Sequence, residues 1–318
     1  MEDELGNLGK IIESWKGENI LWFRNYSLAR LTTVRIGGRC PALAVVQDQE
    51  SLQRLIIRLQ NEGIRYYILG HGSKVLFSSN SFKGVIIKLG KGFSQITPTK
   101  EPFGLLVGAS VSLPEFINYC AKNSFTGMEF TYGIPGTIGG ACATNAGAFG
   151  RSLSDLVEKV FFINKKGEPK EIRIGDEMTR SQIFAYRSMK LEEGGIIIGC
   201  ALKMKGKEKR GAILSRIRKY RKIRNETQPK GFSFGCCFKN PSLQSLGSAG
   251  KLIEEAGLKG FKFGGCYVSK KHANFLLNNG KATFEDFYQT LQIIKLKVEK
   301  KSGVILEEEV RIVRGGTN

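Results

Sequence analysis

The sequence contains only two histidines, His71 and His272, and no pair of cysteines spaced as CxxC. This scarcity excludes a metal centre built from several imidazoles and argues against a cysteine-based zinc site. The seven cysteines are odd in number, which also argues against a disulfide framework. We therefore expect no bound metal, and we expect most of the cysteines to be reduced and packed in apolar surroundings.

Long apolar runs are also missing, because no stretch of the 318 residues approaches the length needed to cross a bilayer. The first ten residues, MEDELGNLGK, are acidic and polar, unlike a secretory signal. We therefore expect a cytoplasmic protein with no membrane partner. The hydrophobic content of 41% and the charged content of 25% are typical of a globular chain, and the length suits two or three domains.

Positive charge is in large excess, since 49 Lys and Arg residues against 29 Asp and Glu residues give a net charge of +20. Such a charge fits nucleic acid or a small polyanionic substrate such as a nucleotide diphosphate. The densest stretch, 203–224, holds eleven basic residues with one acid, Glu208, and one aromatic, Tyr220. Single-strand binders interleave basic and aromatic residues. We therefore interpret the stretch as a solvated helix face and expect no nucleic-acid partner.

Hydrophobic periodicity and capping signals predict a mixed chain of helices and strands. Helical spacing of apolar residues begins at Ser51 and ends at Gly63, and Ser112 with Glu115 forms a capping box. The predicted helices lie at 51–62, 112–119, 213–223, 251–256 and 283–300. The predicted strands lie at 66–69, 85–87, 157–163, 171–174, 195–204, 273–277 and 304–313. A break at 229–231 follows the basic helix, and we place a domain boundary near residue 206.

Two glycine-rich segments have the composition of anion-binding loops. LGHGSK, at 69–74, directly follows a predicted strand, and GIPGTIGGACATNAGAFG, at 133–150, holds six glycines. Glycine lets the backbone approach a ligand closely, and successive N–H groups form a nest for phosphate oxygens. Tight turns explain the first segment equally well, whereas the second is more specific. Neither matches the Rossmann fingerprint or the P-loop, so a pyrophosphate bound here needs another scaffold.

The second segment closely resembles the flavin loop of the UDP-N-acetylenolpyruvoylglucosamine reductase family. Further motifs resemble this family in the same order, from about residue 25 to the end. They are TTVRIGG at 32–38, LGHGSK at 69–74, YRS at 186–188, GCCFKNP at 235–241, AGKLIEEAGLKG at 249–260, SKKHANFLLN at 269–278 and LEEEVRIV at 306–313. The short segment 242–248 resembles the subclass that lacks an extra substrate-covering insertion.

The resemblance implies an α+β fold with two parts. A two-subdomain FAD-binding module of the vanillyl-alcohol-oxidase (PCMH) type is expected at 1–205, with subdomains at about 20–95 and 96–205. A smaller α/β substrate-binding domain is expected at 206–318. The implied protein is a monomer with non-covalent FAD.

The implied activity is the conversion of UDP-N-acetylglucosamine enolpyruvate to UDP-N-acetylmuramate in peptidoglycan precursor synthesis. A hydride passes from NADPH through flavin N5 to the enolpyruvyl methylene carbon, and the neighbouring carbon is then protonated. The resemblance assigns to the cofactor Arg35, Gly70, His71, Gly72, Ser73, Lys74, Gly133, Ile134, Pro135, Gly136, Thr137, Gly139, Gly140, Ala141, Asn145 and Gly147. It assigns to the substrate Tyr186, Asn240, Lys259 and His272, although a capping or surface histidine is an equal alternative for His272.

Three residues match the family's catalytic positions. Arg187, in YRxS, matches the arginine that polarises the substrate carboxylate, a group that suits the guanidinium fork. Glu309 matches the family glutamate, and strand alternation puts its neighbour Glu308 on the opposite face. Cys236 stands where the family usually has a proton-donating serine. A thiol with an ordinary pKa of about 8.5 is mostly protonated at pH 7, so Cys236 is expected to donate the proton. The alternative is a space-filling thiol with water as the donor.

Two further residues depart from the family pattern: Lys74 replaces the usual Asn, and Met189 replaces a frequent second serine after Arg187. Two other functions stay open. One is an FAD oxidoreductase of the same fold with a different substrate, against which GCCFKNP and LEEEV argue because they belong to the substrate side. The other is a basic nucleic-acid-binding protein, suggested by charge alone.

Overall fold

The computed structural model describes residues 9, 12–13 and 19–315. Over this part of the chain, no helix combines the length and apolar character needed to cross a membrane. The chain forms two compact units. Unit 1 comprises the described residues up to Arg24, Ala42–Gly70 and Gly84–Ile223, and unit 2 comprises Asn25–Pro41, His71–Lys83 and the described residues from Arg224. The division at residues 205 and 206 stays a prediction.

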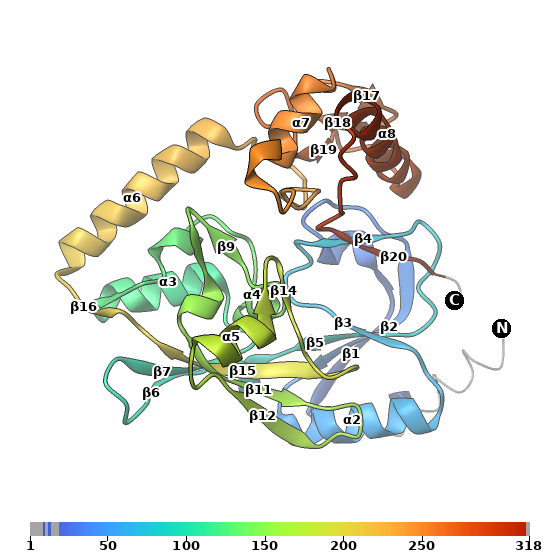
Figure 1. Cartoon of the computed structure of the whole chain (residues 1–318). Helices are drawn as coiled ribbons and strands as arrows, with labels where there is room; N and C mark the ends of the chain where they lie inside the picture. The colour runs from blue at the N-terminus through green and yellow to red at the C-terminus, as the bar shows by residue number, and fades with distance from the viewer. Residues whose placement is uncertain (1–8, 10–11, 14–18, 316–318) are drawn as a thin grey trace. The chain divides into compact units, whose positions relative to one another are not determined.

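The first sheet of unit 1 has the strand order β1-β2-β5-β3, and β5 pairs in parallel with both β2 and β3. Its strands are β1 (Ile20–Ser27), β2 (Arg39–Val46), β3 (Tyr66–Ile68) and β5 (Val85–Leu89). Helix α2 (Gln49–Asn61) covers one face, where Leu52, Leu55 and Leu59 are buried (Figure 1). The helix begins two residues earlier than expected because Asp48, not Ser51, caps it.

The second sheet of unit 1 is antiparallel, with the order β12-β11-β15-β7-β6. Its strands are β6 (Ile96–Pro98), β7 (Gly104–Gly108), β11 (Val157–Ile163), β12 (Pro169–Arg173) and β15 (Ile196–Lys203). Helices α3 (Leu113–Lys122) and α4 (Ile138–Ala143) share a hydrophobic core with this sheet (Figure 1). The hairpin and the strand predicted here are confirmed. Helix α4 was not predicted, because it lies inside the glycine-rich segment.

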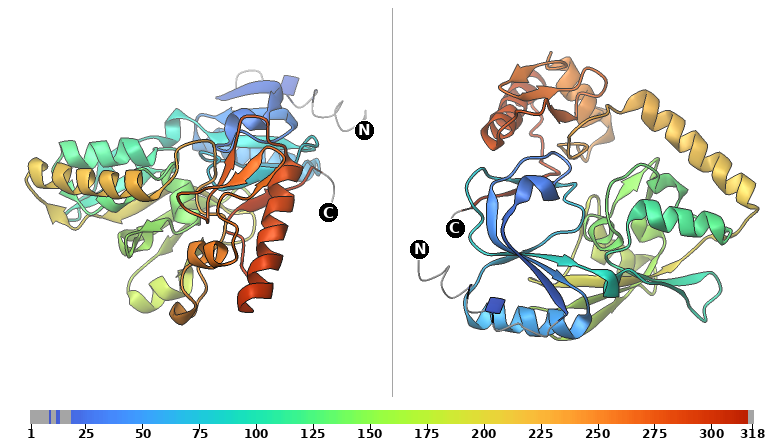
Figure 2. Two further views of the ribbon diagram at one scale, coloured as in Figure 1. Left: turned by 90° about the horizontal axis from the view of Figure 1, so that it is seen from above. Right: turned by 180° about the vertical axis from the view of Figure 1, so that it is seen from behind.

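Unit 2 is built on a three-stranded sheet in the order β17-β18-β19. Its strands are β17 (Lys262–Phe263), β18 (Cys266–Val268) and β19 (Leu276–Asn278). Helices α7 (Ala249–Glu255) and α8 (Phe284–Ser302) share its buried core (Figure 2). The capping box predicted from Thr283 and Asp286 is confirmed at the start of α8.

The last predicted strand, 304–313, is wrong in extent, since only β20 (Arg311–Val313) forms a strand, parallel to β4 (Val75–Phe77). The residues before it are irregular but pair through the backbone with the segment after Cys236: the Glu309 N–H donates to the Cys237 carbonyl at 2.7 Å. Buried Val304, Leu306 and Val310 give this segment the apolar alternation of a strand without its full ladder. Similarly, β19 begins later than its prediction.

The remaining elements are short, apart from α6. They are α5 (Glu177–Ile183), β8 (Phe125–Thr126), β9 (Gly147–Ala148), β10 (Arg151–Ser152), β13 (Phe184–Ala185), β14 (Ser188–Met189), β16 (Gly206–Lys207), and the 3-10 helices η1 (Leu28–Leu31), η2 (Lys91–Phe93), η3 (Glu129–Thr131), η4 (Leu153–Asp155) and η5 (Gln244–Leu246). Basic helix α6 (Arg210–Thr227) buries only Ile213, as expected for a solvated helix. Its Arg216 is anchored to buried Glu129, with Nη2 3.0 Å from Oε1.

Candidate active site

The two predicted cofactor loops meet inside unit 1. Gly70 follows β3, and Thr137 caps the start of α4 by accepting a hydrogen bond from the Gly140 N–H at 3.3 Å. A Cβ atom added to Gly70 would lie 2.9 Å from Thr137 Oγ1, so only glycine fits this approach without a shift. The structure therefore brings together two segments that are more than sixty residues apart in the sequence.

The loop around α4 presents bare backbone rather than side chains. Gly133, Pro135 and Gly140 are exposed, and Gly133 has a φ of 77°. A Cβ atom at Gly140 would meet only Thr137 Oγ1 at 3.4 Å, and one at Gly136 only Leu113 Cδ1 at 3.5 Å. An exposed loop rich in glycine lets an extended ligand approach the main chain, as a flavin with a pyrophosphate requires. The residues present therefore fit FAD.

Lys88, at the end of β5, was missed by sequence analysis. Its Nζ donates a hydrogen bond to the carbonyl of Gly70 at 2.5 Å. Burial lowers the pKa of this lysine, because the protein interior disfavours its charged form. Lysine near a strand end usually extends into solvent, so the sequence offered no signal for a partly buried lysine that holds the first glycine loop.

We expect Lys88→Met to weaken FAD binding by about tenfold or more, roughly 1.4 kcal/mol. The substitution removes the donor to Gly70 and the positive charge beside the loop. Titration of the apoprotein with FAD, followed by quenching of flavin fluorescence, measures the effect. Lys91→Met is the matched control, because Lys91 is exposed on the following 3-10 helix. Equal FAD affinities for the two variants would show that Lys88 has no part in holding the loop.

Arg187 lies beside the flavin loop of unit 1. Its Nη1 would be 3.1 Å from a Cβ atom on Gly147, so glycine there leaves room for the guanidinium. Asn145, in the flavin loop, bonds to the residue before the YRxS turn, because its Nδ2 donates to the Ala185 carbonyl at 3.1 Å. Its Oδ1 accepts from the Ser154 N–H at 3.1 Å. Asn145 thus has a structural role in binding the loop to the YRxS motif, and its contact to the cofactor stays a prediction.

The YRxS motif forms a tight hairpin turn. Ala185 of β13 pairs with Ser188 of β14, so Tyr186 and Arg187 are the two turn residues. Arg187 has a φ of 60°, a left-handed conformation that costs a non-glycine residue about 1 kcal/mol. Its guanidinium carbon lies 5.2 Å from the centroid of the exposed Tyr186 ring. The turn holds the arginine in one place, which suits a group that must meet a substrate carboxylate.

Unit 2 brings together Lys74, Cys236 and Glu309. Lys74 Nζ lies 2.8 Å from Glu309 Oε1, and it donates a hydrogen bond to the Cys236 carbonyl at 2.8 Å. Each of the three consecutive glutamates pairs with a different lysine. Glu307 pairs with Lys239 and Glu308 with Lys295. The side chain of Glu309 is 10% exposed, against 25% for Glu308 and 70% for Glu307. Its burial agrees with the choice of Glu309 as the functional carboxylate.

Asn274, the second residue that sequence analysis missed, fixes the backbone next to Cys236. Its Oδ1 accepts from the N–H groups of Cys237 and Phe238 at 3.2 and 2.9 Å, and its Nδ2 donates to the Phe238 carbonyl at 2.8 Å. Cys237 faces the core, where burial raises the pKa of its thiol. None of the seven cysteines forms a disulfide, and only Cys236 among them is partly exposed. The accessible thiol is therefore the one at the family's serine position.

The predicted substrate residues of unit 2 all make contacts within the protein. Asn240 Oδ1 accepts from the Ala249 N–H at 3.1 Å at the start of α7. Lys259 Nζ lies 2.7 Å from Glu254 Oε1. His272 Nδ1 accepts from the Asn274 N–H at 3.3 Å. Their roles toward a substrate stay predictions.

Arg35, predicted to contact the cofactor, belongs to unit 2. Its φ is 60°, and its guanidinium carbon lies 5.6 Å from the centroid of the Phe232 ring. Gly72, in the same unit, has a φ of 68°, and a Cβ atom on it would lie 2.0 Å from the Leu31 carbonyl oxygen. Glycine is therefore required here by the fold itself. Within the loop at 69–74, the chain passes from unit 1 to unit 2 after Gly70.

We expect the free energy of unfolding to fall as the pH drops below about 6.5, partly through His272. Burial lowers the pKa of its imidazole in the folded protein. The unfolded chain therefore binds more protons between the folded pKa and the ordinary value of about 6.5, and acid favours unfolding. Urea unfolding at several pH values checks this. His272→Gln should make this loss smaller, and an unchanged pH dependence would contradict the assignment.

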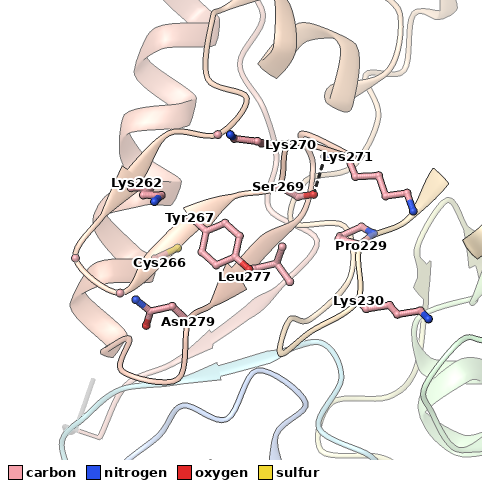
Figure 3. A pocket seen from close by; sticks show the side chains of 13 residues that line it. Pro229, Lys230, Lys262, Cys266, Tyr267, Ser269, Lys270, Lys271, Leu277 and Asn279 are labelled. Carbon is pink, nitrogen blue, oxygen red and sulfur yellow. Dashed lines mark hydrogen bonds between the residues drawn. The ribbon is translucent and has the colours of Figure 1, made fainter. Parts of the chain in front are cut away.

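A hollow of 480 Å³ opens on the β17-β18-β19 sheet of unit 2 (Figure 3). Tyr267 and Leu277 form an apolar part of its lining, and its lysines are Lys230, Lys262, Lys270 and Lys271. The predicted substrate residues Asn240, Lys259 and His272 do not line it. Lys259 and His272 are nevertheless next in sequence to Gly260 and Lys271, which do line it.

Comparisons with known proteins identify an FAD-binding part and a C-terminal part in this chain. A family model described as FAD binding domain matches residues 41–173, and one described as UDP-N-acetylenolpyruvoylglucosamine reductase, C-terminal domain, matches residues 228–313. The reductase of that name from Heliobacterium modesticaldum is 34% identical over 306 residues, which are 96% of this chain and 93% of the relative. That from Aquifex aeolicus is 33% identical over 297 residues, 92% of this chain and 96% of the relative.

A solved structure of a reductase with this name has a similar fold. The crystal structure of UDP-N-acetylenolpyruvylglucosamine reductase (MurB) from Thermus caldophilus aligns with a TM-score of 0.75 at 30% identity, covering 92% of this chain and 98% of the other. The predicted fold class, an α+β chain with an FAD-binding module and a smaller C-terminal domain, is confirmed. With relatives of this identity along nearly the whole length, the chain belongs to the UDP-N-acetylenolpyruvoylglucosamine reductase family.

Proposed function

We propose that this protein reduces UDP-N-acetylglucosamine enolpyruvate to UDP-N-acetylmuramate for peptidoglycan precursors, with FAD as cofactor and NADPH as hydride donor. The observation that carries this proposal is the placement of the catalytic candidates. Arg187 lies against the flavin loop at Gly147, and Cys236 and Glu309 are joined through Lys74. The full-length similarity to reductases of that name supports the choice of substrate.

FAD, when bound, supplies the hydride for the reduction. We propose that Gly70, Thr137 and their neighbouring loops hold this cofactor, together with Arg35, His71, Gly72 and Ser73. Arg187 would bind the substrate carboxylate and stabilise the negative charge that develops beside it. A planar guanidinium in a fixed turn suits this role, because its two N–H groups match two carboxylate oxygens.

Cys236 would donate the proton to the carbon next to the carboxylate. Its thiol is partly exposed and is carried on a backbone held by Asn274. We propose that Glu309 acts on the same enolpyruvyl group and helps to hold this proton. Asn240, Lys259, His272 and Tyr186 would bind the rest of the UDP-sugar, where the net charge of +20 attracts a diphosphate.

We further propose that the enzyme works as a monomer in the cytoplasm, without nucleic acid or a membrane as partner. Two measurements test the function. An absorbance spectrum of the purified protein should show bound flavin, and NADPH oxidation should depend on the enolpyruvyl UDP-sugar. Flavin without that dependence would favour an FAD oxidoreductase with another substrate. Protein that neither contains nor takes up FAD would overturn the proposal.

A further inference from the structure

Lys74 stands at the meeting point of three chain segments of unit 2. It directly precedes β4, whose partner β20 begins two residues after Glu309. The Arg311 N–H donates to the Lys74 carbonyl at 2.9 Å, and the Glu309 N–H donates to the Cys237 carbonyl at 2.7 Å. The main chain thus fixes the three segments side by side. The lysine side chain points toward the Glu309 carboxylate and the peptide of Cys236.

The ammonium group of Lys74 contacts both proposed catalytic residues of unit 2. It lies 2.8 Å from Glu309 Oε1 and 2.8 Å from the Cys236 carbonyl oxygen. Gly235, with a φ of 74°, lies beside it, since a Cβ atom there would make an ordinary contact of 3.6 Å with Nζ. The pair is sheltered, with side-chain exposures of 26% for Lys74 and 10% for Glu309. An ion pair of low exposure holds its partners more firmly than one in water.

Lys74 and Cys236 are also the two departures from the family pattern with the clearest chemical consequence, and the structure places them in contact. An asparagine is shorter and uncharged, so it cannot neutralise Glu309 in the same way. In this chain the residue at this position contacts the carboxylate and the peptide that carries the thiol.

We propose that Lys74 is a positioning residue for the protonation step, rather than a ligand of the flavin. It holds the Glu309 carboxylate and the Cys236 peptide in fixed relative positions, so that thiol and carboxylate face the substrate together. The inference rests on the proposed roles of Cys236 and Glu309. Since Lys74 acts through Glu309, its removal affects substrate reduction and leaves reduction of the flavin by NADPH intact.

The test is Lys74→Met, which keeps the chain length and removes the charge. In anaerobic stopped-flow experiments, flavin reduction by NADPH should stay within about twofold, and flavin reoxidation by the enolpyruvyl UDP-sugar should slow on the order of 10- to 100-fold. Lys74→Arg should recover most of the rate, because it keeps a cation at this site. Lys295→Met is the matched control, since the Lys295 side chain is 28% exposed, close to the 26% of Lys74, and pairs with Glu308, and it should leave both rates unchanged.

A double-mutant cycle separates this role from simple loss of structure. In a Glu309→Gln background, Lys74→Met should slow reoxidation by much less than it does in the native protein, because only its bond to the Cys236 peptide is then lost. Additive losses, or a Lys74→Met enzyme with full reoxidation rate, would overturn the inference. So would a loss of FAD affinity with normal reoxidation, which would make Lys74 a flavin ligand. If Glu309→Gln itself reoxidises at the normal rate, the proposed role of Glu309 fails instead.

Discussion

Cys236→Ala is expected to slow substrate reduction by at least about 100-fold, while NADPH still reduces the flavin at the normal rate. The alanine removes the proton donor but keeps the backbone, which Asn274 holds through its bonds to Cys237 and Phe238. Stopped-flow measurement of the two half-reactions separates these effects. An alanine variant with undiminished turnover would show that water, not the thiol, supplies the proton.

Cys236→Ser is the matched variant. A hydroxyl has nearly the size of the thiol and is the group that the family usually carries here, so measurable turnover should remain. The thiol is also the only partly exposed one among the seven cysteines, so alkylation of the native protein should inactivate it and spare Cys236→Ser. Protection by the enolpyruvyl UDP-sugar would place the alkylated group at the substrate site. Equal sensitivity of both proteins would point to another thiol.

Arg187→Met is expected to lower kcat/KM for the enolpyruvyl UDP-sugar by about 100- to 1000-fold, because no other group is proposed to stabilise charge beside the carboxylate. Flavin reduction by NADPH should change little. Arg187→Lys should recover only part of the loss, since an ammonium cannot bind both carboxylate oxygens in the fork geometry. Steady-state kinetics in both variants check this expectation.

Arg173→Met is the control for the loss of positive charge. Arg173 lies on β12 of the same unit and forms an exposed ion pair with Glu171, so its removal should leave kcat/KM unchanged. If Arg187→Met and Arg173→Met behave alike, the arginine in the YRxS turn is not the group that polarises the substrate.

Periodicity and capping are local properties, so the sequence predicted the longer helices and several strands, but it missed the eight-residue strands β1 and β2 and the five-residue β7. The α8 capping box and the β11–β12 hairpin are examples of what it predicted. Helix α4 escaped prediction because its glycines and alanines give no periodic apolar face, although Thr137 caps it. The strand predicted at 304–313 was too long because buried irregular chain shows the same alternation as a strand.

Sequence analysis predicted the residues of the candidate site only where they lie in motifs that resemble the family. Arg187, Cys236 and Glu309 came from their positions in family motifs. Lys88 and Asn274 did not, since their importance lies in contacts to distant backbone groups, at Gly70 and at Cys237, that no local pattern encodes. The ion pair of Lys74 with Glu309 joins residues more than two hundred positions apart, so only the fold shows it.

A single anaerobic turnover tests the central claim most directly. Protein whose flavin has been reduced with NADPH is mixed with UDP-N-acetylglucosamine enolpyruvate, and the flavin absorbance and the nucleotide product are followed together. We predict that one equivalent of substrate reoxidises the flavin and yields one equivalent of UDP-N-acetylmuramate. A flavin that stays reduced, or that is reoxidised without formation of this product, would contradict the account.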